Sequence, residues 1–426
     1  MRSVPENGSG HKRPGPRSAA PALPTHGRAP RHHVPVTRIG ILTGGGDVPG
    51  LNSIIKSVVY RGREIGWDIL GIRRGWMGLT HLGPDGEGDG DFVRSLTREN
   101  TRAIDRTGGT MLHTSRTNPA RMKRDGLPQH LDGARIASFA TDEDRFDLTP
   151  VVLENIGRLG LTHLVTIGGD DTLGYANRLV GEGVPLVAIP KTMDNDVQGT
   201  EYCVGFSTAV TRAKELINRQ RTTLGSHERI GVFRIFGRNS GYSAWYAAYV
   251  TSSRCVIPEA PFDLDRLATL LTEDRAANPS SYALVIASEG AVWAGATLAE
   301  YGEPDAYGHR RPLDIGATLA EELHRLTGVE TVHSDLTYDL RSGDPDALDQ
   351  MVATTFANVA VDLLAAGVNG RMVAIRDGKY AHAPLPDPSI GPRHVDVATM
   401  YSTDRLRPLY AERLGMPLLL GPSIEP

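Results

Sequence analysis

Short apolar runs alternate with longer amphipathic stretches between residues 147 and 189. The runs at 161–167 and 184–189 have the length of buried strands, whereas the stretches at 148–159 and 172–181 have the length of helices. This alternation is typical of a parallel sheet whose strands are joined by right-handed helical crossovers. Ligands of such sheets bind beyond the carboxyl ends of the strands, so polar residues that follow a strand are candidates for chemistry.

The same pattern extends to both sides of this segment and predicts a second α/β unit. We expect further helices at 50–65, 207–224, 240–252 and 348–366, and further strands at 38–42, 67–72, 229–236, 282–288 and 371–375. The expected fold class is therefore α/β, with two Rossmann-like three-layer domains and a cleft between them. The strand at 371–375 is expected to return to the first domain.

The amino-acid composition bears on the kind of binding partner, on the cellular compartment and on the N-terminal segment. The formal net charge is −4 with acids and bases interspersed, which gives no reason to expect nucleic acid or a membrane surface as partner. Cys203 and Cys255 cannot form a disulfide framework, and we expect a cytoplasmic protein. Residues 1–36 hold seven prolines, six lysines or arginines and one acid, which predicts a disordered basic tail.

Two glycine turns suggest a phosphate site. The first, Thr-Gly-Gly-Gly-Asp-Val-Pro-Gly-Leu-Asn at 43–52, lies between a predicted strand and a predicted helix. Its glycines let backbone amides approach a ligand, and the helix dipole favours an anion there. The turn matches neither the P-loop nor the dinucleotide fingerprint, so it does not identify the ligand. The second turn, at 106–116, ends in Arg116, which can clamp phosphate oxygens.

Four carboxylates follow two neighbouring predicted strands. Asp170 and Asp171 come after the first strand, and Asp194 and Asp196 come after the next. Carboxylates gathered at one edge of a sheet repel each other, and either a cation or protonation of one member relieves that repulsion. The sequence therefore predicts a Mg²⁺ site at this edge.

Four motifs in a fixed order resemble the phosphofructokinase family. They are the glycine turn at 43–52, Gly-Gly-Asp at 168–170, Pro-Lys-Thr-Met-Asp-Asn-Asp at 190–196 and Gly-Arg at 237–238. The resemblance extends from about Arg38 to about Gly370. It implies the phosphofructokinase fold, with a phosphoryl-donor domain at 37–205 plus about 342–392. The sugar-phosphate domain would comprise 206–341 plus about 393–426.

The resemblance also implies roles for individual residues. Phosphoryl transfer depends on positioning and charge neutralisation more than on covalent help. Asp194 would take the proton from the 1-hydroxyl of the sugar, with Asp171 and Lys191 also at the catalytic centre, and Asp170 would hold Mg²⁺. The donor would contact Gly45, Arg116, Thr117, Asp171 and Thr172. The sugar phosphate would contact Thr192, Asp194, Arg229, Phe236, Gly237, Arg238, Glu289, Tyr338 and Arg341.

Two positions favour pyrophosphate as the donor. ATP-using members carry glycine where this chain has Asp171, and a carboxylate there repels the α-phosphate of a nucleotide. Lys191 replaces a second glycine and can bind the terminal phosphate of the donor. The resemblance thus implies a pyrophosphate-dependent phosphofructokinase of glycolysis and gluconeogenesis, acting on fructose 6-phosphate as a homodimer or homotetramer.

Departures from the family pattern leave alternatives open. The segment at 337–343 keeps Arg341 but not its usual neighbours, and Val332 stands where bacterial relatives have an arginine that reaches a neighbouring subunit's sugar phosphate. Sedoheptulose 7-phosphate is therefore a second candidate acceptor, and ATP a second candidate donor. A kinase of NAD or a lipid is disfavoured by the 190–196 loop. A non-catalytic regulatory subunit is disfavoured by the presence of Asp170, Asp194 and Arg238.

Overall fold

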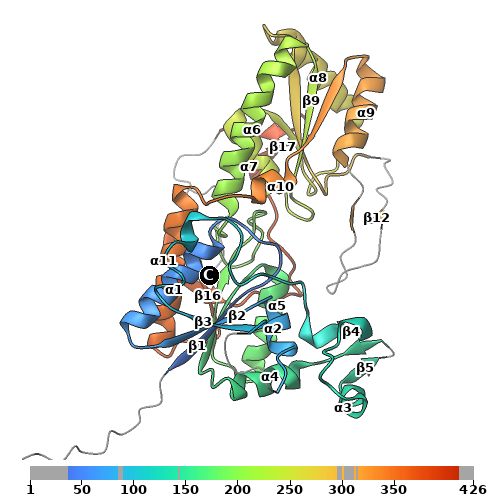
Figure 1. The fold of residues 1–426 in the computed structure, drawn as a ribbon. Coiled ribbons are helices and arrows are strands. Elements are labelled where there is room, and N and C mark those ends of the chain that lie inside the picture. Colours follow the sequence, from blue (N-terminus) through green and yellow to red (C-terminus); the bar gives the residue numbers. More distant parts are fainter. Residues whose placement is uncertain are drawn as a thin grey trace, which may run out of the picture. The chain divides into compact units, whose positions relative to one another are not determined.

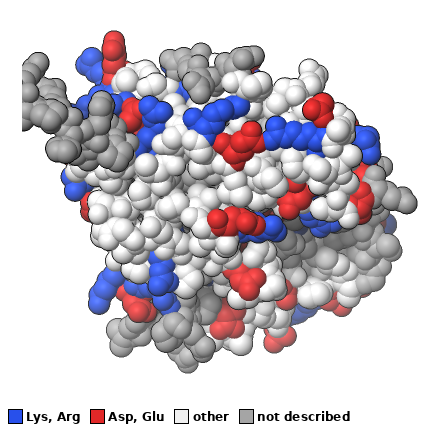
Figure 2. Space-filling model, turned by 90° about the horizontal axis from the view of Figure 1, so that it is seen from below, with Lys and Arg blue, Asp and Glu red and all other residues white. Residues whose placement is uncertain are grey.

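The computed structural model describes residues 37–84, 90–142, 144–294, 300–301, 311–312 and 315–411. The predicted tail at 1–36 lies outside these residues, as does the end of the second expected domain beyond residue 411. No helix in the described ranges is both long enough and apolar enough to span a bilayer. Figure 2 shows acidic and basic side chains intermixed on one face of the molecule, in keeping with the small formal net charge.

The larger sheet has seven strands in the order β16-β15-β8-β7-β1-β2-β3. Their bounds are β1 Arg38–Thr43, β2 Asp68–Ile72, β3 Val93–Leu96, β7 His163–Gly168, β8 Leu186–Pro190, β15 Arg371–Arg376 and β16 Lys379–Pro384. The five central strands are parallel, as predicted, and β15 returns to this sheet. The edge strands β3 and β16 are antiparallel and were not predicted. Asp377 and Gly378, both at positive φ, join β15 to β16 in a two-residue turn that only antiparallel strands can use.

Helices cover both faces of this sheet, as Figure 1 shows. One face carries α1 (Leu51–Glu64) and α11 (Ala347–Ala365), and the other carries α2 (Trp76–Thr80), α4 (Thr149–Arg158) and α5 (Asp170–Gly181). Successive strand residues point to opposite layers, so Ile41 packs with α1 whereas Leu42 packs on the side of α5. This is the three-layer arrangement that the alternating pattern predicts.

The second sheet has four parallel strands in the order β10-β11-β9-β14. Their bounds are β9 Ile230–Ile235, β10 Arg254–Val256, β11 Ala283–Ser288 and β14 Thr331–Asp335. Two pairs of contacting helices pack on it, namely α6 (Phe206–Ser226) with α7 (Tyr242–Thr251) and α8 (Leu264–Ala277) with α9 (Ile315–Thr327). The two sheets agree with the two units expected from the sequence, while the exact domain boundaries stay a prediction.

Shorter elements, none of them predicted, connect these layers. A three-stranded sheet of β4 (Met122–Lys123), β6 (Arg145–Phe146) and β5 (Ala140–Asp142) accompanies α3 (Gly133–Ser138). The remaining elements are α10 (Thr337–Arg341), α12 (Val397–Met400), β17 (Tyr401–Ser402), β18 (Arg407–Pro408), β12 (Glu300–Tyr301), β13 (Arg311–Pro312) and 3-10 helices at Ile104–Arg106, Pro119–Arg121 and Arg124–Gly126. Of these, α10 matters most for the site because it carries Tyr338 and Arg341.

Two glycines allow the starts of α1 and α6 to pack against each other. Gly50 and Gly205 precede these helices, and both have a φ of 103°, which favours glycine. A β-carbon on Gly50 would lie 2.6 Å from Val204 Cγ1, and one on Gly205 would lie 2.5 Å from Val48 Cβ. The first glycine turn is therefore held beside the segment that precedes α6.

Candidate active site

The first glycine turn lies where the order of the large sheet reverses. β1 has β2 on one side and β7 on the other, and ligands of doubly wound sheets bind at such a switch point. Gly44 N donates to Ile167 O at 2.9 Å, and Gly45 N donates to Ser115 O at 3.1 Å. The second bond joins Gly45 to Ser115, the residue before Arg116 and Thr117, which are the other donor candidates from these two turns.

Thr172, in the first turn of α5, packs against Gly44 of the glycine turn. It is only 2% exposed, and a β-carbon on Gly44 would lie 2.5 Å from its Oγ1. A β-carbon on Gly168 would lie 2.2 Å from Thr172 Cβ. Glycine is therefore required at both positions for β1 and β7 to approach the start of α5 this closely.

Asp170 and Asp171 form the first turn of α5, whereas the sequence predicted that this helix begins at Thr172. Acids are favoured at that end of a helix by its dipole, which the apolar pattern does not reveal. Burial, followed by the charges of Asp196 and Asp171, raises the pKa of Asp170 to about 7, and Lys191 opposes this shift. A cation beside Asp170 would relieve the repulsion.

The described residues contain no group of three or more His, Cys, Asp or Glu side chains that could hold a metal ion by themselves. Mg²⁺ usually takes one or two protein carboxylates and completes its shell with water and substrate phosphates. Asp170 fits a Mg²⁺ ion of this kind, because the ion would share the site with a bound phosphate donor.

Lys191 places a positive charge inside the donor turn. The side chain is buried, and its Nζ lies 3.2 Å from where a β-carbon on Gly45 would stand. Burial, followed by the charge of Arg341, lowers the pKa of Lys191 to about 8, while Asp196, Asp171 and Asp47 oppose the shift. An ammonium group here can contact a phosphate that lies at the glycine turn.

The acid loop at 190–196 is fixed by its own backbone and by Asn195. Thr192 N donates to Val204 O at 3.1 Å, next to a parallel bridge between Lys191 and Val204. Asn195 adopts a left-handed conformation with a φ of 53°, donates to Glu201 O at 2.9 Å and accepts from Cys203 N at 2.8 Å. The loop therefore holds Asp194 in a defined position.

Asp194 has an unpaired carboxylate oxygen. Its Oδ1 is inaccessible to solvent and accepts no hydrogen bond from any described residue, while its backbone N donates to Thr192 Oγ1 at 3.2 Å. Burial, followed by the charges of Asp196 and Glu289, raises the pKa of Asp194 well above its ordinary value, and Arg341 and Lys191 oppose this. A carboxylate with a raised pKa and a free oxygen is suited to accept a proton from a bound hydroxyl.

Five of the predicted acceptor residues follow the carboxyl ends of strands in the second sheet: Phe236, Gly237 and Arg238 follow β9, Glu289 follows β11, and Arg341 lies on α10 after β14. Glu289 follows β11, and burial raises its pKa while the charges of Arg234, Arg238 and Arg341 lower it. The Arg341 guanidinium lies 4.8 Å from the ring centre of Phe236, and its Nη1 lies 3.6 Å from Asp47 Oδ1. Arg341 thus links the acceptor side to the donor turn.

Gly237 makes a close turn after β9. Its φ is 119°, and a β-carbon there would lie 2.5 Å from Ser240 O. Gly237 O also accepts from Gly290 N at 3.1 Å, so the turn lies next to the end of β11. Arg238 is thereby placed near Glu289, as the pairing of their charges indicates.

Two predicted acceptor residues point elsewhere within this chain. Arg229 precedes β9 at its amino end and pairs with Glu330 at 2.7 Å. Six strand residues separate it from the opposite end of β9, where Phe236 and Arg238 lie. Tyr338 is 78% exposed on α10. The fold of a single chain therefore does not bring Arg229 or Tyr338 to Asp194.

Sequence reasoning missed Arg234 and Arg393. Arg234 lies in β9, with its Nη2 3.4 Å from Glu289 Oε2 and its Nη1 2.7 Å from Asp335 Oδ2. A charged residue within the apolar run of a buried strand is a signal that could have identified it. Arg393 donates to Thr200 O at 2.7 Å and to Asn195 O at 3.3 Å behind the acid loop, and no local motif marks it.

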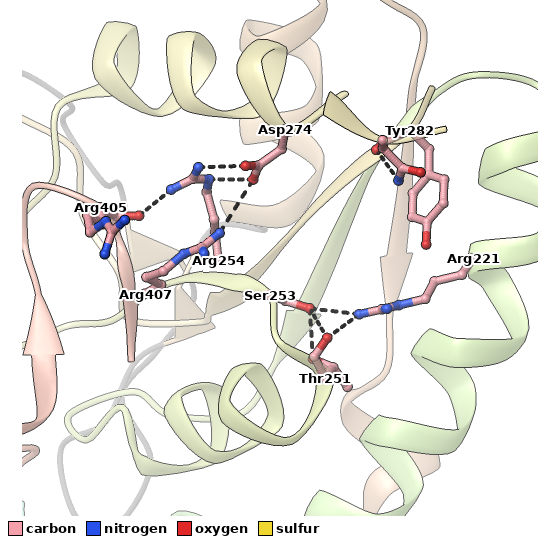
Figure 3. A network of polar contacts seen from close by, with 9 residues as sticks. Arg221, Thr251, Ser253, Arg254, Asp274, Tyr282, Arg405 and Arg407 are labelled. Carbon is pink, nitrogen blue, oxygen red and sulfur yellow. Dashed lines mark hydrogen bonds and ion pairs between the residues drawn. The ribbon is translucent and has the colours of Figure 1, made fainter. Parts of the chain in front are cut away.

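A separate polar cavity of about 250 Å³ lies at the amino ends of β10 and β11 (Figure 3). Arg254 forms two hydrogen bonds with Asp274, at 2.6 and 2.7 Å, and Arg407 lies 3.7 Å from the same carboxylate. Arg221 donates to Ser253 Oγ at 3.1 Å. Since Glu289 lies at the other end of β11, this cavity is distinct from the candidate active site.

Comparison with known proteins agrees with this geometry. The family model described as Phosphofructokinase matches residues 38–364. Pyrophosphate--fructose 6-phosphate 1-phosphotransferase of Streptomyces coelicolor is 37% identical over 85% of this chain and 97% of its own. ATP-dependent 6-phosphofructokinase 3 of the same organism is 35% identical over 82% of this chain and 94% of its own.

The fold is also found among solved structures. Phosphofructokinase from Saccharomyces cerevisiae superposes with a TM-score of 0.63 at 22% identity. The match covers 82% of this chain but only 44% of the longer yeast chain, and it confirms the expected α/β phosphofructokinase fold. The family match and the 37% identical relative show that this chain belongs to the phosphofructokinase family.

Proposed function

We propose that this phosphofructokinase transfers a phosphoryl group from pyrophosphate to the 1-hydroxyl of fructose 6-phosphate. The observation that carries the proposal is the unpaired, buried Oδ1 of Asp194. The charges that act on this carboxylate come from both sides of the site: Lys191 from the donor side, and Glu289 and Arg341 from the acceptor side. A sugar hydroxyl bound between these groups would supply the missing hydrogen bond and lose its proton to Asp194.

The chain's own residues perform the remaining tasks by binding and positioning. The glycine turn around Gly45, together with Arg116, binds the donor, and Lys191 balances the charge of the leaving phosphate. Asp170 would hold a Mg²⁺ ion, which when bound neutralises the charge of the donor phosphates. On the acceptor side, Arg238 and Arg341 bind the 6-phosphate and Glu289 binds a sugar hydroxyl.

The choice of donor rests on Asp171 and Lys191. The charge of Asp171 acts on both Asp170 and Lys191, which supports a position at the proposed donor site, where a carboxylate would repel the α-phosphate of a nucleotide. Pyrophosphate has no such group. The 37% identical relative is named for pyrophosphate, which supports this donor, whereas the 35% identical relative is named for ATP and defines the competing hypothesis.

The position of Arg229 supports a proposal about the subunit arrangement. Its position at the amino end of β9 leaves it outside the site of its own chain. We infer that it contributes to the sugar-phosphate site of a second copy in a homodimer or homotetramer. Each site would then receive one arginine from the partner.

A donor-by-acceptor screen tests the proposal. Purified protein is assayed with pyrophosphate or ATP, each at equal Mg²⁺, against fructose 6-phosphate and sedoheptulose 7-phosphate. We expect turnover with pyrophosphate and fructose 6-phosphate. Exclusive use of ATP would overturn the donor, and preference for the seven-carbon sugar would overturn the acceptor. The same screen without Mg²⁺ tests the metal requirement.

A further inference from the structure

Arg393 is a buried arginine that lies beyond the part of the chain matched by the family model. It is 6% exposed and belongs to the segment that follows β16. Burying a guanidinium is unfavourable unless its donors are satisfied. Its hydrogen bonds therefore indicate what the arginine holds in place.

Those hydrogen bonds converge on the acid loop. Nη1 of Arg393 donates to Thr200 O at 2.7 Å and to Asn195 O at 3.3 Å. Its backbone N donates to Asp196 O at 2.6 Å. These three contacts reach the carbonyl groups of Asn195, Asp196 and Thr200, all of which follow the catalytic candidate Asp194 in the chain.

The rest of the guanidinium is packed on α7. Its centre lies 4.9 Å from the ring centre of Tyr242, and Nη2 donates to the Tyr242 hydroxyl at 3.4 Å. That hydroxyl donates to His394 O at 2.8 Å, and Ser243 Oγ donates to Met193 O at 2.7 Å. The start of α7 and Arg393 therefore both form hydrogen bonds with the backbone of the acid loop.

The loop also has an uncommon backbone conformation. Asn195 has a φ of 53°, in the left-handed region that few residues other than glycine adopt and that asparagine tolerates best. Arg393 binds the carbonyl of Asn195 itself. Without that bond, the adjacent peptide is freer to relax, and the carboxylate of Asp194 moves with it.

We infer that Arg393 is a positioning residue that fixes the acid loop so that Asp194 meets the acceptor hydroxyl. The inference rests on the proposed role of Asp194. Arginine suits this task because its planar guanidinium can donate to two carbonyls while stacking on an aromatic ring. Lysine offers only a point charge on a flexible stem.

The test compares Arg393→Met and Arg393→Lys with a matched control, Arg219→Met, which removes an exposed arginine from α6. We expect Arg393→Met to lower kcat about 100-fold, since a displacement of about 1 Å at the reacting centre has that effect. The KM values for both substrates should stay close to those of the wild type. Arg393→Lys should recover thermal stability more than kcat, and Arg219→Met should match the wild type.

Hydrogen exchange supplies a second readout that does not depend on turnover. Peptides covering residues 193–203 should exchange faster in both Arg393 variants, whereas peptides from β1 and β9 should not change. A folded Arg393→Met protein with wild-type kcat and exchange would overturn the inference. If Arg393→Met does not fold, the Arg393→Lys variant decides, and a wild-type kcat in Arg393→Lys would overturn the inference. A wild type inactive with every donor refutes the proposed function, and exchange still decides whether Arg393 holds the loop.

Discussion

Arg234 donates a hydrogen bond to Asp335 at 2.7 Å and lies 3.4 Å from Glu289, so a guanidinium on β9 contacts the ends of β14 and β11, the two strands that flank β9. Asp335 in turn accepts from Thr337 N at 3.0 Å, at the start of the short helix that carries Arg341. Arg234 therefore links Glu289, which is expected to bind the sugar, to α10, whose Arg341 is expected to bind the sugar phosphate.

Replacing Arg234 should weaken acceptor binding selectively. We expect Arg234→Met to raise the KM for fructose 6-phosphate about tenfold or more, corresponding to about 1.4 kcal/mol. The KM for pyrophosphate should change little because Glu289 and Asp335, with which this arginine pairs, both lie on the acceptor side. Steady-state kinetics with each substrate varied in turn measures both constants. Equal changes in the two constants would contradict a specific role.

Asp194→Asn should remove catalysis while leaving binding intact. General-base catalysis contributes about 10²- to 10⁴-fold, so we expect kcat to fall by about 10³-fold with little change in either KM. Thermal stability should be maintained or increased, because the variant replaces a buried carboxylate that has an unpaired oxygen with a neutral amide. Wild-type turnover in this variant would instead favour the non-catalytic regulatory subunit.

Asp171→Gly should relax the choice of donor. Removing the carboxylate frees space beside Lys191 and removes the repulsion of a nucleotide's α-phosphate. The ratio of kcat/KM for ATP to kcat/KM for pyrophosphate is expected to rise by at least about tenfold, equivalent to about 1.4 kcal/mol. Asp171→Asn keeps the size of the side chain but removes its charge. Comparison of the two variants therefore shows whether charge repulsion or steric bulk excludes ATP. An unchanged ratio in both variants would show that another feature selects the donor.

The activity should decline in alkaline solution as Lys191 loses its proton. Its pKa is lowered to about 8, so the ammonium form is present below that pH and is lost as the pH rises through it. We expect kcat/KM for pyrophosphate to fall above about pH 8, because this parameter reports the free enzyme. Lys191→Arg should move the decline to higher pH, since arginine stays charged. Pyrophosphate itself titrates equally in both assays, so its effect cancels when kcat/KM of the wild type is divided by kcat/KM of Lys191→Arg. If this ratio did not change with pH, Lys191 would not be the group whose titration causes the decline.

Asp349 should be essential for stability rather than for chemistry. It is fully buried in α11 and accepts from Tyr202 OH at 2.6 Å and from Gly205 N and Thr208 N, each at 2.8 Å. Each buried donor left unpaired costs about 1–3 kcal/mol, so Asp349→Ala should lower the free energy of unfolding by about 3 kcal/mol or more. Asp362→Ala, an exposed site on the same helix, is the control and should change it by about 0.5 kcal/mol or less. Urea denaturation measures both.

The sequence predicted most strands of the two large sheets for a local reason, and the same reason underlies its donor-site candidates, which stay a prediction. Glycine turns, strand-end carboxylates and the lysine of the acid loop all lie within a few residues of the strand that positions them, so their spacing survives in the fold. Asp194, Lys191 and Glu289 follow predicted strands, and the structure brings their charges together. The start of α5 was misplaced because the helix dipole, not an apolar face, favours Asp170 and Asp171 in its first turn.

Only the tertiary structure revealed the residues that support the site from a distance. Arg393 lies 198 residues from Asn195 along the chain, and Arg234 lies 101 residues from Asp335, yet each pair is in hydrogen-bond contact. The edge strands, the contact between Arg341 and Asp47, and the exposure of Tyr338 were likewise decided by packing. Local sequence encodes which backbone turns can form. The partner of a buried charge depends on which strands and helices the fold places side by side, and no short-range pattern contains that information.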